Sequence, residues 1–168
     1  GAVATKLALA GGPVTSAYCE VLEERPDSRR FLADWEAWFG QRIEILGNDH
    51  YGRSIHRVFS QDNYLVGPGG ARCTLKLKKT VREKFERPDD VQVFGYTAEE
   101  QNRVDRFIDG NPRVRIKTPL IERSLGKADC KELLRRAGIV LPAMYALGYA
   151  NNNCVGCVKG GAGYWNKI

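Results

Sequence analysis

The sequence lacks several features that would place it in a specialised class of protein. No apolar run approaches the roughly 20 residues that a membrane-spanning helix needs. Residues 1–10 carry neither a basic leader nor a long apolar centre, which argues against a secretory signal. There is no internal repeat and no low-complexity segment. We therefore expect neither a membrane span nor a secretory signal, and predict an ordinary globular protein of the cytoplasm.

Acidic residues are also in deficit, because 26 Lys and Arg face 20 Asp and Glu and give a net charge of +6. Such a balance suits an anionic partner, either a phosphorylated small molecule or nucleic acid. The length of 168 residues suits one domain with one core. The five cysteines are an odd number, and two are spaced Cys-x-x-Cys, so metal or redox chemistry is favoured over a disulfide framework.

The apolar pattern alternates between helix and strand. Helices are predicted over 2–10, 26–39, 74–86, from 97 onward and over 128–137, with strands over 13–19, 42–46, 91–95 and 114–117. Residues 47–71 read as mostly loop, with a short helix near 54–59. Alternation of this kind predicts an α/β fold with a parallel sheet covered on both faces. Ligands are then expected in the loops after Cys19, Leu46, Gly95 and Lys117.

The most specific motif is Cys154-Val155-Gly156-Cys157, followed by Lys159. Two intervening residues allow both sulfurs to face one metal, and Gly156 permits the tight turn. One pair supplies only two ligands, so further cysteines are needed, and a reduced, unligated pair is the alternative.

A second motif is Gly69-Gly70-Ala71-Arg72-Cys73-Thr74, which leads into Lys76 and Lys78. A glycine turn that enters a helix presents free N–H groups to an anion, and Arg72 can add a bidentate fork. The alternative is an ordinary helix start on a solvated basic face. A third segment, residues 95–103, has a capping box in which Glu100 is structural, although Glu100 and Arg103 also share a helix face.

Five groups of residues together resemble the phosphoadenosine phosphosulfate (PAPS) reductase-like proteins, many of which are encoded by bacteria and bacteriophages. Residues 142–149 with 152–161 and 163–167 are similar to the family's C-terminal part. Arg72-Cys73-Thr74 with Leu77-Lys78 is similar to its central cysteine segment. The remaining matches are Gly95-Tyr96 with Glu100 and Arg103, Pro119-Leu120-Ile121 with Asp129-Cys130, and Tyr18-Cys19-Glu20 with Glu24, Pro26 and Asp27.

The resemblance implies a three-layer sandwich with a mostly parallel central sheet, of the adenine nucleotide α-hydrolase-like (PP-loop) superfamily. It implies a nucleotide-binding α/β domain over 1–141 and a cysteine-knuckle segment over 142–168 packed on that domain. The family's first strand and its Ser-Gly-Gly-x-x-Ser phosphate loop are missing from this sequence. We therefore expect the sequence to be a trimmed or processed form of a longer protein.

The resemblance also assigns roles to residues. Catalytic roles are expected for Cys73 and Glu100. Nucleotide or anion binding is expected at Arg72, Thr74, Lys78, Gly95 and Arg103, with ATP or PAPS as the nucleotide. Cys73, Cys154 and Cys157 would hold an iron–sulfur cluster, and zinc, the alternative, would need a fourth ligand, for which Cys130 is the reserve.

The implied function is that of an adenine-nucleotide-binding enzyme of sulfur metabolism, either an oxidoreductase that reduces a sulfonucleotide or a transferase that transfers sulfur after adenylation. The chain lacks the Glu-Cys-Gly-type tail that carries the catalytic cysteine of sulfonucleotide reductases. One alternative is sulfur transfer to tRNA or DNA, and another is a non-catalytic binding module with a structural metal knuckle. The expected partner is a phosphorylated small molecule, with nucleic acid as the alternative, no membrane, and a homodimer left open.

Overall fold

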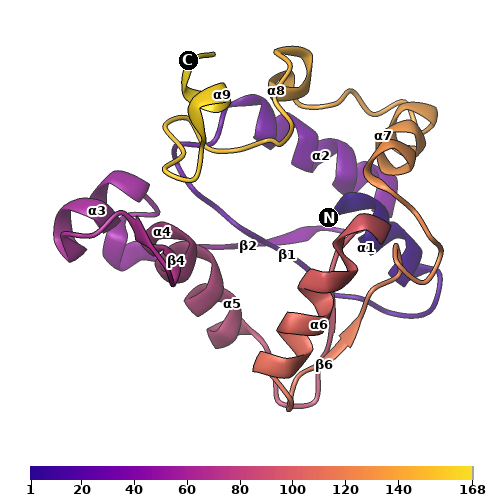
Figure 1. Cartoon of the computed structure of the whole chain (residues 1–168). Helices are drawn as coiled ribbons and strands as arrows, with labels where there is room; N and C mark the ends of the chain where they lie inside the picture. Colours follow the sequence, from indigo (N-terminus) through magenta and orange to yellow (C-terminus); the bar gives the residue numbers. More distant parts are fainter. Residues whose placement is uncertain (168) are drawn as a thin grey trace. The chain divides into compact units, whose positions relative to one another are not determined.

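The computed structural model describes residues 1–167 and has a mixed α/β fold (Figure 1). The chain divides into two compact units, each assembled from separated segments. The first unit comprises residues 1–16, 31–42 and 87–141, and the second comprises residues 17–30, 43–86 and 142–168. None of the helices in residues 1–167 combines the length and the apolar character needed to cross a membrane.

The first unit is built around a parallel strand pair. Its elements are α1 (Ala2–Leu9), residues 31–39 of α2 (Asp27–Phe39), β5 (Val91–Val93), η3 (Ala98–Glu100), α6 (Gln101–Gly110), β6 (Arg115–Lys117) and α7 (Lys127–Arg136). Val91 pairs with Arg115 and Val93 with Lys117, and α6 makes the crossover between the two strands. The expected strand–helix–strand unit is therefore confirmed here, and α6 supplies the long connection that parallel strands need.

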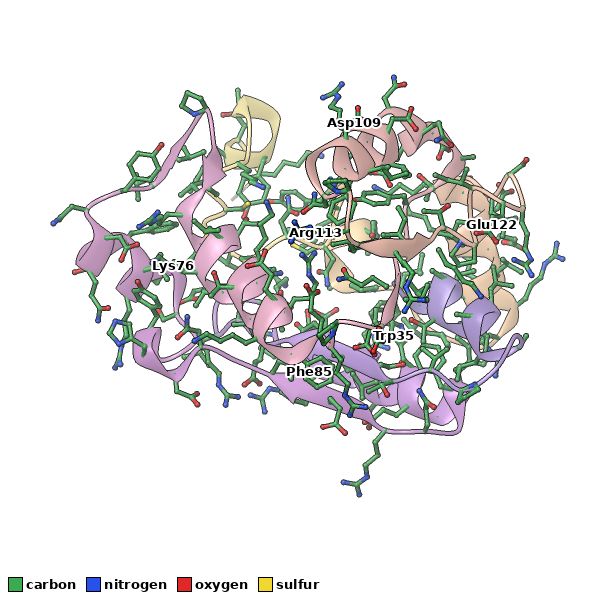
Figure 2. The ribbon with its side chains drawn as sticks, turned by 90° about the horizontal axis from the view of Figure 1, so that it is seen from below. Trp35, Lys76, Phe85, Asp109, Arg113 and Glu122 are labelled. Atoms are coloured by element: carbon green, nitrogen blue, oxygen red, sulfur yellow. The ribbon has the colours of Figure 1, made fainter. Side chains whose placement is uncertain are left out.

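The core of the first unit joins α1, α2 and α7. Phe31 of α2 and Leu134 of α7 are buried with Ala2, Val3 and Ala4 of α1. Trp35 and Phe39 follow Phe31 at helical spacing and pack against this cluster. Trp35 is labelled in Figure 2. These aromatic side chains of α2 therefore belong to the core of the first unit.

The second unit contains the rest of α2, most of β1 (Ser16–Cys19), β2 (Ile43–Leu46), η1 (Asp49–Tyr51), α3 (Ile55–Asp62), β3 (Val66–Gly67) and β4 (Gly70–Ala71). Next comes a continuous helix made of α4 (Arg72–Thr74), the π-helical turn η2 (Leu75–Lys79) and α5 (Thr80–Phe85), which we call the cysteine helix. The short helices α8 (Ala143–Ala146) and α9 (Ala162–Trp165) complete the unit. Lys76 and Phe85 of the cysteine helix are labelled in Figure 2.

Two apolar clusters hold the second unit together. Leu77 of the cysteine helix is almost fully buried with Val21, Tyr51, Ile55 and Val58. Burial of a side chain of this size contributes about 1.5–3 kcal/mol relative to leaving it exposed. Met144, Tyr149 and Tyr164 form the other cluster, within residues 142–168. The cysteine helix is therefore anchored by its apolar face, which leaves its polar side chains for other contacts.

The strands differ from the continuous sheet that the alternation suggested. In residues 1–167 they form three separate two-stranded sheets: β1 with β2, β3 with β4, and β5 with β6. The β3–β4 pair is an antiparallel hairpin inside the stretch expected to be mostly loop, and α3 extends the expected short helix to Asp62. Two-residue strands have no apolar alternation to detect, so the pattern missed this hairpin.

Candidate functional site

The cysteines at 73, 154 and 157 line one cavity within the second unit. This cavity, which we call the thiol pocket, has a volume of about 180 Å³. Cys73 comes from the cysteine helix, and the other two come from the loop between α8 and α9. Its polar lining also includes Glu24, Thr74, Lys78, Asn152, Asn153 and Lys159. Tertiary structure thus brings together sulfurs about 80 residues apart in the chain.

The cysteine helix presents its first turns to the pocket. Gly70, with a φ of +95°, turns the hairpin, and the N–H of Arg72 donates to the carbonyl of Leu65 at 3.0 Å, which fixes where the helix begins. Cys73, Thr74, Leu77 and Lys78 then reach the same cavity. The π-helical turn over Leu75–Lys79 lies in this stretch, and such turns occur frequently at functional sites.

The Cys-x-x-Cys loop is held by backbone hydrogen bonds within the second unit. The N–H of Val155 donates to the carbonyl of Glu23 at 2.8 Å, and the N–H of Gly160 donates to that of Cys157 at 2.8 Å. Gly156 has a φ of +76°, a conformation that costs other residues about 1–2 kcal/mol. The glycine between the cysteines is therefore required by the turn, as the motif predicted.

Charged groups in the pocket are arranged around one carboxylate. Lys78 Nζ lies 3.1 Å from Glu24 Oε1, and the Tyr18 hydroxyl donates to Glu24 Oε2. Burial raises the pKa of Cys154 to about 11, which the nearby Lys78 ammonium partly offsets. Burial also raises the pKa of Cys73. In the absence of a metal, both thiols therefore stay protonated at neutral pH.

Arg72 does not line the thiol pocket but a second cavity of about 420 Å³, formed by residues 62, 64, 69–72 and 75. Its guanidinium pairs with Asp62, which also accepts a hydrogen bond from the Tyr51 hydroxyl at 2.8 Å. The hydrogen bond from Arg72, with that from Tyr51, lowers the pKa of Asp62. Arg72 is thus already engaged by a carboxylate, while Thr74 and Lys78 lie at the thiol pocket.

The remaining nucleotide-binding candidates, Gly95 and Arg103, belong to the first unit together with Glu100. Glu100 Oε2 accepts from the N–H of Thr97 at 3.1 Å and completes the capping box. Its other oxygen pairs with Arg103, whose guanidinium lies 5.1 Å from the centre of the Tyr96 ring. Both carboxylate oxygens of Glu100 therefore have structural partners.

The other two cysteines have different surroundings. Cys130, the reserve ligand, lies on α7 in the first unit and packs against its apolar core. Cys19 ends β1, and its thiol lies 3.7 Å from the Lys78 carbonyl oxygen. Burial raises the pKa of both thiols.

The donor set of the thiol pocket fits a thiophilic ion or an iron–sulfur cluster, because three thiols face one cavity beside two ammonium groups. Within residues 1–167, no three His, Cys, Asp or Glu groups stand at metal-binding geometry. Cys73, Cys154 and Cys157 would therefore need to draw closer around an ion.

The sequence interpretation missed the position of Glu24. The sequence could have indicated that Glu24 lines a site, because Glu24 lies in the loop after the strand that ends at Cys19, one of the loops in which ligands were expected. Asn152, Asn153 and Lys159 were visible beside the cysteine motif, but only the structure shows that their side chains reach the same cavity as Cys73.

Comparisons of the chain with protein-family models, with curated proteins and with solved structures find no match.

Proposed function

We propose that this chain is a PAPS reductase-like enzyme of sulfur metabolism that binds an adenine nucleotide and reacts at a thiolate centre. The supporting observation is the convergence of Cys73, Cys154 and Cys157 on one cavity with Lys78 and Lys159. The proposal includes the three-layer α/β sandwich of the adenine nucleotide α-hydrolase-like superfamily, of which the parallel β5–β6 pair would form part.

The lining residues of the pocket define what it can bind. Two ammonium groups outnumber the one lining carboxylate, Glu24, so a phosphate or sulfate group is favoured there. The hydroxyl of Thr74 and the amides of Asn152 and Asn153 offer further hydrogen-bond donors to the oxygens of such a group. A sulfonucleotide carries both types of oxyanion, which makes it the substrate class that this lining suits best.

The three thiolates would hold an iron–sulfur cluster, with zinc as the alternative. When bound, a cluster would supply electrons or an open iron site, whereas zinc would stabilise the conformation of the loop. Lys78 and Lys159 would stabilise the thiolate form of the cysteines that surround them.

The proposal is tested by anaerobic purification followed by metal analysis and a visible absorption spectrum. Broad absorbance in the blue region, lost in Cys73→Ser and in Cys154→Ser, is the expected result. Cys130→Ser is the matched control, because Cys130 packs on the apolar core of the first unit. Bound zinc with no turnover would favour the non-catalytic module instead.

Calorimetry with ATP and PAPS tests the nucleotide part of the proposal. Binding of either nucleotide with a dissociation constant in the micromolar range is expected for an enzyme of this class. Absence of measurable heat with both nucleotides, in a sample that retains its metal, contradicts the assignment.

Transfer of sulfur to nucleic acid is a second candidate, favoured by exposed Lys79 and Lys84 on the helix that carries Cys73. A strand held by such lysines releases counterions, so its affinity should fall steeply as salt rises. Binding that depends on phosphate contacts weakens severely between 50 and 200 mM salt. A tRNA or DNA affinity that does not change over this range would eliminate this candidate.

A further inference from the structure

The hydroxyl of Tyr164 lies inside the Cys-x-x-Cys loop and bonds to both cysteine residues. It donates a hydrogen bond to the carbonyl oxygen of Cys154 at 2.6 Å and accepts one from the N–H of Cys157 at 3.2 Å. The phenol thus bridges the two ends of the turn. The backbone bonds of Val155 and Gly160 tie the loop to Glu23 and to Cys157, but do not join one cysteine to the other.

The aromatic ring that carries this hydroxyl is fixed on several sides. Tyr164 is 8% exposed, and its ring centre lies 5.3 Å from that of Tyr149 and 5.5 Å from that of Trp165. Its backbone N–H is anchored to the Gly161 carbonyl at 2.8 Å. Gly160 lies against the ring so closely that a Cβ there would fall 2.6 Å from Tyr164 Cγ. The position of the hydroxyl is therefore set by packing and not by the loop alone.

Core packing by itself explains the ring but not the hydroxyl. A phenylalanine would fill the same space between Tyr149 and Gly160 without spanning the turn. The hydroxyl instead meets a carbonyl and an N–H that belong to the two cysteines whose sulfurs would share one ion. Groups that hold ligand residues in orientation commonly change metal affinity by about 10–100-fold when removed.

We propose that Tyr164 is a positioning residue that sets the separation of the Cys154 and Cys157 sulfurs for a shared thiophilic ion. The inference rests on the proposed function, because it concerns the same thiol pocket. In this proposal, α9 fixes the conformation of the cysteine loop before an ion binds.

The first test is anaerobic titration with Co²⁺ alone, followed by its thiolate charge-transfer absorbance. Tyr164→Phe should bind Co²⁺ about 10–100-fold more weakly than the unmodified chain. Tyr149→Phe is the matched control, since it removes a hydroxyl from the same aromatic cluster, and among the described residues the bonds to Cys154 and Cys157 come from the Tyr164 hydroxyl. Thermal melts by circular dichroism should show that both metal-free variants remain folded at the temperature of the titration.

A second pair of variants keeps the test independent of the phenylalanine substitution. Gly160→Ala should displace the Tyr164 ring and weaken Co²⁺ binding in the same way. Gly161→Ala is its control, because a Cβ there meets nothing within 4 Å. Absence of a thiolate band in the unmodified chain would overturn the proposed thiolate centre and this inference with it. A band that both Tyr164→Phe and Gly160→Ala retain at full affinity would overturn the positioning role alone.

Discussion

Lys78 and Glu24 form an ion pair at the thiol pocket, with Lys78 Nζ 3.1 Å from Glu24 Oε1. The carboxylate is 12% exposed and also accepts the Tyr18 hydroxyl, whereas the Lys78 side chain is 45% exposed. Glu24 is therefore the fixed partner, and it holds the ammonium at the wall of the cavity. Lys159 lines the same cavity, and no carboxylate of the described residues lies within ion-pair distance of its ammonium group.

Lys159→Met should weaken binding of ATP or PAPS at the thiol pocket. Loss of one charge-assisted contact costs about 1.5 kcal/mol, which corresponds to roughly tenfold in the dissociation constant. Calorimetry measures the change, and Lys79→Met is the control because Lys79 is exposed and lies outside the pocket lining. Equal losses in both variants would mean that the effect is one of net charge and not of the pocket.

Glu24→Gln should strengthen the binding of ATP or PAPS at the thiol pocket. The substitution removes the negative charge that faces an incoming anion and releases Lys78 from its ion pair, so nucleotide binding should become tighter. The measurement is again calorimetry, repeated at 0.1 and 0.5 M salt, because screening should reduce the gain. Weaker binding in Glu24→Gln would show that Lys78 needs its partner in order to act.

Asp62→Asn should make the free energy of unfolding depend less on pH in the acid range. Arg72, which donates a hydrogen bond to Asp62, and Tyr51, which donates another, lower the pKa of this carboxyl in the folded state. A lowered pKa stabilises the fold at pH values above about 4, the ordinary pKa of an aspartate, and the stabilisation is lost as pH falls through the folded value.

Urea denaturation between pH 2 and pH 7 measures this effect. The unfolding midpoint of Asp62→Asn should lie below that of the unmodified chain at neutral pH, and the two should converge in acid. Asp49→Asn is the control, since the Asp49 side chain is 82% exposed in its pair with Arg53. A difference for Asp62→Asn that stays constant with pH would rule out the ionic contribution.

Neighbouring leucines on α7 should respond very differently to truncation. Leu134 is 7% exposed in the core of the first unit, whereas Leu133 is 36% exposed. Leu134→Ala should lower the free energy of unfolding by about 2–4 kcal/mol, because it leaves a cavity. Leu133→Ala should cost much less, within roughly 1 kcal/mol. Equal losses in chemical denaturation would contradict the burial of this core.

Glu100 should behave as a helix cap. Thr97→Ala removes the other half of the capping box and should cost about 1 kcal/mol of stability. Glu100→Gln retains an oxygen for the Thr97 N–H and should leave stability nearly unchanged. If Glu100→Gln also retains turnover, the catalytic role expected for Glu100 is excluded; abolished turnover with normal stability would support that role.

Local signals predicted much of the secondary structure. Thr97 and Glu100 have the spacing of a capping box and form one, and the helix predicted over 26–39 corresponds to α2 (Asp27–Phe39). The turn at Gly156 was predicted for the same reason, because its cause lies within a few residues. The β3–β4 hairpin was missed, since two-residue strands leave no periodic pattern.

The sequence alone determined the helix and strand periodicity, the surplus of basic residues and the geometry of the Cys-x-x-Cys turn, because each depends on residues near one another in the chain. The tertiary structure decided which groups meet at the thiol pocket. It placed Glu24 against Lys78, turned Arg72 toward Asp62 and set the Tyr164 hydroxyl between Cys154 and Cys157. Contacts of this kind follow from how buried side chains such as Leu77 and Tyr149 pack, and packing between distant segments leaves no periodic mark on the sequence.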